Sequence, residues 1–123
     1  MKVLNGQRIL VLEEEASIAQ LLVDMLEALN CRVIGPADRI PQALHLLVEH
    51  DADAAILDVK IEGKPSYPVA EELVRRGIPW AFASSNNADD FAHRYPDVPA
   101  IAKPYSSAHI QDVLERLLAP DQP

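Results

Sequence analysis

Two stretches of the chain are continuous apolar runs that end in carboxylates. Residues 8–12 read Arg-Ile-Leu-Val-Leu and precede three glutamates, and residues 54–57 read Ala-Ala-Ile-Leu and precede Asp58. Apolar runs of this length without helical spacing are typical of strands buried on both faces of a sheet. Two predicted strands therefore carry acidic residues at their carboxyl ends.

Segments with helical spacing alternate with short apolar runs along the rest of the chain. The predicted strands after residues 8–12 are residues 32–34, 54–58, 79–83 and 98–102. The predicted helices are residues 16–29, 42–50, 69–76 and 88–94, and a last helix that Ser106 or Ser107 caps and that extends to Leu118. Gly35-Pro36 is expected to stop the second strand, and residues 60–68 are expected to form a loop.

Five predicted strands thus alternate with five predicted helices. Parallel strands need crossover connections, which are right-handed, so strict alternation favours a parallel sheet with helices on both faces. The predicted fold class is α/β, a doubly wound five-stranded sheet. A chain of 123 residues is long enough for one such core, and residues 1–123 are expected to form a single domain.

Composition narrows the range of functions. The formal net charge of −8 argues against binding to the phosphate backbone of a nucleic acid. Cys31 is the only cysteine, which excludes an internal disulfide and fits a reducing cytoplasm. No run approaches the ~20 apolar residues of a membrane span. We expect a cytoplasmic protein with no nucleic-acid partner and no membrane association.

The carboxyl ends of parallel strands lie at the edge of the sheet where ligands bind. The residues that follow four of these strands include Glu13 with Glu14, Asp58, Ser84 and Lys103. Clustered carboxylates normally require a cation between them, and Mg²⁺ suits oxygen ligands. With a lysine and a hydroxyl nearby, such a site would stabilise a phosphoryl group transferred to a nucleophilic carboxylate. An acidic triplet alone is equally typical of a solvated helix start.

The chain resembles the receiver domains of two-component response regulators. Residues 8–15 are similar to the acidic opening of that family, residues 54–59 to the strand that bears its phosphorylated aspartate, and residues 102–105, Ala-Lys-Pro-Tyr, to its lysine motif. Residues 67–73 and 77–84 are also similar to a branch of stand-alone receivers. The resemblance implies a flavodoxin-like sheet with strand order 2-1-3-4-5.

The resemblance also implies roles for individual residues. Asp58 would accept a phosphoryl group from a histidine kinase or histidine phosphotransferase, as in a phosphorelay. Glu13, Glu14 and Asp58 would hold Mg²⁺, Ser84 would contact the phosphoryl group and Lys103 would pair with it. A single-domain regulator of this kind would signal in trans by binding an unknown downstream protein.

Four residues bear on departures from the family pattern. Receivers usually carry Asp where this chain has Glu14, and the longer side chain shifts the ligand oxygens of a metal that tolerates misfit poorly. They usually carry Tyr or Phe where this chain has Ala100, which removes the common aromatic switch. Lys60 and Asn86 are candidate modulators of phosphoryl lifetime, and an exposed ion pair is the simpler interpretation of Lys60.

Two other functions remain open at this stage. The same fold without phosphorylation would be a pseudo-receiver that acts as an interaction module, with Glu14 imitating an occupied site. A Mg²⁺-dependent phosphohydrolase usually has a second Asp two residues after its nucleophile, where this chain has Lys60. We therefore expect no enzyme activity. Receivers often pair through their fourth helix, fifth strand and fifth helix, so a homodimer is a further alternative.

Overall fold

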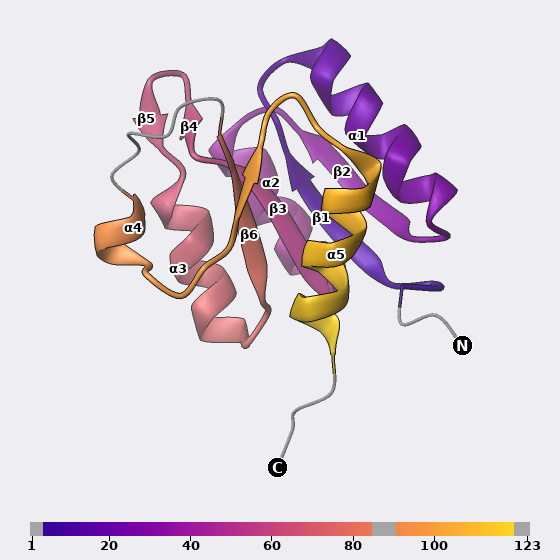
Figure 1. Ribbon diagram of the computed structural model, residues 1–123. Helices are drawn as coiled ribbons and strands as arrows, with labels where there is room; N and C mark the ends of the chain where they lie inside the picture. Colours follow the sequence, from indigo (N-terminus) through magenta and orange to yellow (C-terminus); the bar gives the residue numbers. More distant parts are fainter. Residues whose placement is uncertain (1–3, 85–90, 120–123) are drawn as a thin grey trace.

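The computed structural model describes residues 4–84 and 91–119, along which helices alternate with the strands of one central sheet (Figure 1). The strands are β1 (Arg8–Leu12), β2 (Arg32–Ala37), β3 (Ala54–Asp58), β4 (Lys60–Ile61), β5 (Lys64–Pro65), β6 (Trp80–Ser84) and β7 (Ala100–Ala102). The helices are α1 (Ala16–Ala28), α2 (Ile40–Glu49), α3 (Tyr67–Arg76), α4 (Phe91–Arg94) and α5 (Ser107–Leu118).

Five of the strands form one parallel sheet in the order β2-β1-β3-β6-β7. Counting only these five, the order is 2-1-3-4-5, which confirms the predicted fold class. Figure 1 shows α1 and α5 on one face of the sheet and α2 and α3 on the other. Each face has its own apolar core, and the strands between them are buried on both sides. No helix within the described residues is long and apolar enough to cross a membrane.

Strand β2 is longer than the sequence indicated. It continues through Gly35-Pro36 to Ala37, with an irregularity in its pairing to β1. Since β2 is an edge strand, the proline's missing N–H costs no bond to a further strand. The extension matters for the site, because the Glu13 backbone N–H donates to the Ala37 carbonyl at 2.9 Å.

The predicted loop at residues 60–68 was wrong in part. Strands β4 and β5 pair as a small antiparallel hairpin, and the two residues between them, Glu62 and Gly63, have φ of +54° and +75°. Two successive positive φ angles are what a tight hairpin turn requires, but Glu is an unusual residue at the first of them. Helix α3 then begins at Tyr67, because Pro68 is tolerated within the first turn of a helix.

The other element boundaries differ from the predictions by a few residues. Strand β6 ends at Ser84, and β7 begins at Ala100 rather than at residue 98. Helix α2 begins at Ile40, ahead of Pro41. Helix α4 is described from Phe91, and the earlier part of the predicted helix lies outside the described residues. Ser106 caps α5, its hydroxyl accepting from the His109 N–H at 3.4 Å.

The conformation of Gly35 yields a stability prediction. Its φ is +102°, and a Cβ added there would lie 2.7 Å from the Ala37 nitrogen and 3.2 Å from the Val11 carbonyl oxygen. We expect Gly35→Ala to lower the free energy of unfolding by about 2–4 kcal/mol, since backbone strain and a backbone clash add. Gly77, with φ of +70° and open space around it, is the matched control, and Gly77→Ala should cost about 1 kcal/mol. Equal losses in urea unfolding would contradict the clash.

Candidate functional site

A lysine and two carboxylates meet at the carboxyl edge of the sheet. Lys103 Nζ lies 2.8 Å from Glu13 Oε1 and 3.0 Å from Asp58 Oδ1. Glu13 follows β1, Asp58 ends β3, and Lys103 follows β7, so three separate strands bring the charges together. The Lys103 side chain is only 13% exposed and that of Glu13 only 1%. The cluster is thus largely withdrawn from water.

Glu13 is held from several directions. Its Oε1 also accepts from the Tyr105 hydroxyl at 3.2 Å, and its Oε2 accepts from the Glu15 backbone N–H at 3.1 Å. A buried carboxylate with this many donors is satisfied without water. Glu13 therefore forms a fixed anion beside Asp58.

The surroundings of the two carboxylates shift their pKa values in opposite directions, upward for Asp58 and downward for Glu13. Burial, and then the neighbouring charge of Glu13, raise the pKa of Asp58 to about 6, although Lys103 opposes the rise. Burial alone would also raise the pKa of Glu13, but hydrogen bonds from Lys103 and the Glu15 N–H lower it below its usual range. Asp58 is therefore the carboxylate that takes up a proton first as the pH falls.

This arrangement predicts that Asp58 costs stability at neutral pH. Its folded pKa of about 6 lies above the ordinary Asp value of about 4, so its contribution to stability is full below pH 4 and is lost as the pH rises through 6. We expect Asp58→Asn to raise the melting temperature by a few degrees at pH 7.5 and to leave it unchanged near pH 4. Melting curves in metal-free buffer test this. An increase of equal size at both pH values would contradict it.

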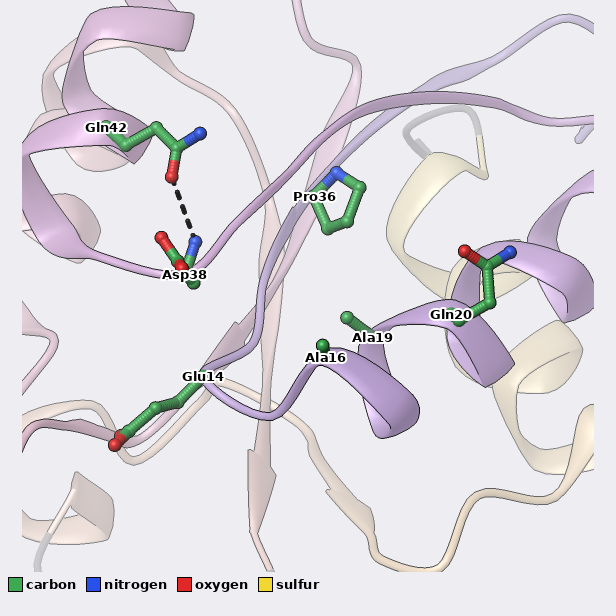
Figure 2. Close-up of a pocket in the computed structure, with 7 residues that line it drawn as sticks. All are labelled: Glu14, Ala16, Ala19, Gln20, Pro36, Asp38 and Gln42. Atoms are coloured by element: carbon green, nitrogen blue, oxygen red, sulfur yellow. Dashed lines mark hydrogen bonds between the residues drawn. The ribbon is translucent and has the colours of Figure 1, made fainter.

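Glu14 lies apart from this cluster. Its Oε1 accepts from the Glu62 backbone N–H at 2.9 Å, so the side chain reaches the turn of the β4–β5 hairpin. Figure 2 shows this side chain directed away from Pro36 and Gln20, which line the same pocket of about 280 Å³ between the start of α1, the end of β2 and the start of α2. Neither Asp58 nor Lys103 lines that pocket. The predicted role of Glu14 as a metal ligand requires its side chain to turn.

The other candidate residues lie in different settings. Ser84 ends β6, half-buried, and its carbonyl accepts from the Lys103 N–H at 3.1 Å. Lys60 is exposed on β4 and forms no ion pair with the described residues. Ala100 is exposed at the start of β7, opposite Phe82 of β6. Asn86 lies outside the described residues.

The site offers a divalent cation two carboxylate ligands, those of Glu13 and Asp58. Within residues 4–84 and 91–119, no group of three or more His, Cys, Asp or Glu side chains is arranged to hold a metal ion. However, Glu13 and Asp58 already bind one shared cation, the Lys103 ammonium. Mg²⁺ is usually held by one or two carboxylates together with waters and phosphate oxygens. Glu13 and Asp58 therefore fit Mg²⁺, and Glu14 would have to move to join them.

Two residues in contact with the cluster were not assigned roles from the sequence. Tyr105 carries the hydroxyl that donates to Glu13. Its position directly after Lys103-Pro104 is the sequence feature from which this contact could have been inferred. Ser66, fully buried at the start of α3, donates from its hydroxyl to the Asp58 carbonyl oxygen at 2.6 Å. Its position in a predicted loop gave no such signal.

Comparisons with known proteins agree with this geometry. No protein-family model matches the chain. Its structure is similar to the solution structure of SdrG from Sphingomonas melonis Fr1, with 38% sequence identity, a TM-score of 0.83, and coverage of 97% of this chain and 100% of that one. It also shares its fold with the receiver domain of the sensor histidine kinase PA1611 from Pseudomonas aeruginosa PAO1. The two sequences are 22% identical, the TM-score of the superposed structures is 0.81, and the match covers 94% of this chain and 99% of that one.

The PA1611 structure holds a magnesium ion in its active-site cleft. Among curated proteins, the chain is 28% identical over 113 residues to the transcriptional regulatory protein PdtaR of Mycobacterium tuberculosis, which covers 89% of this chain. The chain spans about half the length of that relative, 55%. With a relative that matches along its whole length, and with an acidic cluster and a lysine at the expected sheet edge, the chain belongs to the receiver domains of response regulators.

Proposed function

We propose that this chain accepts a phosphoryl group on Asp58 from a phosphorylated histidine of a histidine kinase or histidine phosphotransferase. The observation that carries the proposal is the Lys103 ammonium bridging Asp58 and Glu13 at 3.0 and 2.8 Å. A fixed cation beside a carboxylate nucleophile is placed to offset the charge that a phosphoryl group brings. With a pKa of about 6, Asp58 is largely ionised at pH 7.5 and able to act as that nucleophile.

In the transfer step, one Asp58 carboxylate oxygen attacks phosphorus. A P–O bond forms as the P–N bond to the donor imidazole breaks, and the imidazole nitrogen takes up a proton. Lys103 stays beside the Asp58 carboxylate, and Ser84 at the end of β6 would contact the new phosphoryl oxygens. Bound Mg²⁺, held by Glu13 and Asp58, would supply charge neutralisation for those oxygens.

The phosphorylated chain would then signal by binding another protein in the cytoplasm. The net charge of −8 favours a basic protein surface over a nucleic acid as the partner. We expect no turnover of phosphate esters, because Lys60 stands where phosphohydrolases of similar chemistry place a second Asp.

The test is transfer of labelled phosphate from an autophosphorylated histidine kinase. The native chain should take up label that hydroxylamine releases, as expected for an acyl phosphate, while Asp58→Asn should take up none. Arg75→Gln, a change at a side chain of α3 that is 75% exposed, should behave like the native chain. Label that survives hydroxylamine, or that appears equally in Asp58→Asn, would contradict the proposal.

A pseudo-receiver is the second candidate, and one observation favours it. Glu14, which occupies the position of the usual metal ligand, is engaged with the Glu62 N–H instead. In that case the chain would bind its partner without phosphorylation, and Asp58→Asn would leave partner binding unchanged.

A further inference from the structure

The common receiver switch is absent from this chain, since Ala100 has no ring to move. The structure nevertheless has a continuous set of contacts from Asp58 to α4. We propose that Ser66, Tyr67 and Arg94 form a relay that carries the state of Asp58 to the α3–α4 surface. This inference rests on the proposed function, because phosphorylation of Asp58 is its input.

Ser66 is the first link. Its hydroxyl donates to the Asp58 carbonyl oxygen at 2.6 Å, and its backbone N–H donates to the Val59 carbonyl oxygen at 2.8 Å. The residue is fully buried and directly precedes α3. A shift of the backbone at Asp58 must therefore either move the start of α3 or break a buried hydrogen bond, which is costly.

Tyr67, the first residue of α3, is the second link. Its ring packs edge-to-face on Tyr95 with centroids 5.6 Å apart, and on Phe82 at 6.3 Å. Phe82 lies on β6 two residues before Ser84, and its ring is 4.7 Å from that of Phe91 at the start of α4. Ala100 pairs in register with Phe82, so this aromatic cluster lies on the same face of the sheet as the missing ring, in the core beneath α3.

Arg94 of α4 is the third link. Its guanidinium lies 4.9 Å from the centre of the Tyr67 ring and 5.9 Å from that of Tyr95, and it pairs with Glu71 on the next turn of α3. Figure 1 shows α4 beside the start of α3. Cation–π contact and an ion pair together tie the two helices, so motion of Tyr67 changes how Arg94 is presented at the surface.

Trp80 provides a built-in reporter. It is the only tryptophan, its ring lies 5.4 Å from Tyr95 and 6.1 Å from Phe82, and its Nε1 is buried without a hydrogen-bond partner among the described residues. Its emission should therefore respond to repacking of the cluster. Beryllium fluoride with Mg²⁺ serves as the probe, because it imitates a phosphoryl group on a carboxylate.

The experiment measures probe binding and Trp80 emission separately in the full chain. Calorimetry reports binding, and fluorescence reports the relay. In the native chain both should respond, and in Asp58→Asn neither should. Ser66→Ala and Arg94→Gln should keep binding but reduce the emission change at least about twofold. Arg94 is about half exposed, so Arg94→Gln is expected to fold even where Ser66→Ala does not. Arg75→Gln, the same type of change at an exposed side chain of α3 outside the path, should respond like the native chain.

The outcomes separate the two proposals. Failure of the probe to bind the native chain would contradict the proposed function and overturn the relay with it, because the relay would then have no input. Normal binding with an unchanged emission response in both Ser66→Ala and Arg94→Gln would overturn the relay alone. Normal binding with no emission change in the native chain would overturn it as well.

Discussion

Replacing Lys103 with methionine is expected to lower the free energy of unfolding by about 3 kcal/mol at pH 7.5 without added metal. The substitution keeps most of the unbranched apolar stem of the side chain and removes the ammonium that lies 2.8 Å from Glu13 and 3.0 Å from Asp58. The Glu13 side chain is 1% exposed, so its negative charge would be left buried without its cation. Breaking a buried pair in this way typically costs about 3–5 kcal/mol. Urea unfolding followed by Trp80 emission measures the loss.

Two controls isolate the cause of this loss. Arg116→Met removes a cation of an exposed ion pair on α5 and should cost about 0.5 kcal/mol or less. Adding Glu13→Gln to Lys103→Met should recover much of the lost stability, because the uncompensated charge disappears. A loss for Lys103→Met no larger than that for Arg116→Met would show that the cluster is not the charge-coupled unit described above.

Magnesium is expected to produce the second large effect. If Mg²⁺ binds only the folded chain, a concentration of 100 times its dissociation constant adds about 2.7 kcal/mol to stability. Asp58→Asn should lose most of this gain, since it removes one of the two carboxylates that share a cation. Mg²⁺ should also restore part of the stability that Lys103→Met loses. Stabilisation of equal size in the native chain and in Asp58→Asn would place the ion elsewhere.

Glu14 allows a sharper form of the magnesium experiment. Its side chain now accepts from the Glu62 N–H at 2.9 Å, and aspartate, shorter by one methylene, would not reach that donor as well. Glu14→Asp should therefore tighten Mg²⁺ binding, by roughly tenfold if the freed carboxylate becomes a ligand. Calorimetry on Glu14→Asp and Glu14→Ala checks this. Identical dissociation constants in both variants would mean that this position does not take part.

The sheet could be predicted from the sequence because its strands are buried on both faces. The boundaries of β1 and β3 agree with the prediction. In both strands a continuous apolar run is followed by an acidic residue, and this change of polarity marks the end of the strand. The extension of β2 past Gly35-Pro36 could not be foreseen, because the tolerance of proline depends on β2 being an edge strand. The two-residue strands β4 and β5 are too short to have a sequence signature.

The candidate site was predictable for the residues that stand at strand ends. Strand alternation alone places Glu13, Asp58 and Lys103 at one edge of the sheet, and the structure joins them by ion pairs. The orientation of Glu14 was not predictable, because it depends on the positive-φ turn at Glu62. The contacts of Tyr105 and Ser66 depend on tertiary packing, which no local spacing encodes.

The central claim is that the Glu13–Lys103–Asp58 cluster makes Asp58 a phosphoryl acceptor. The most direct measurement is intact mass after incubation with a small-molecule acyl phosphate donor. With Mg²⁺ present, the native chain should gain a single phosphoryl adduct, and with the metal chelated the adduct should be greatly reduced. Asp58→Asn should gain none. A native chain that gains no adduct at any Mg²⁺ concentration, or an adduct that persists in Asp58→Asn, would contradict the claim.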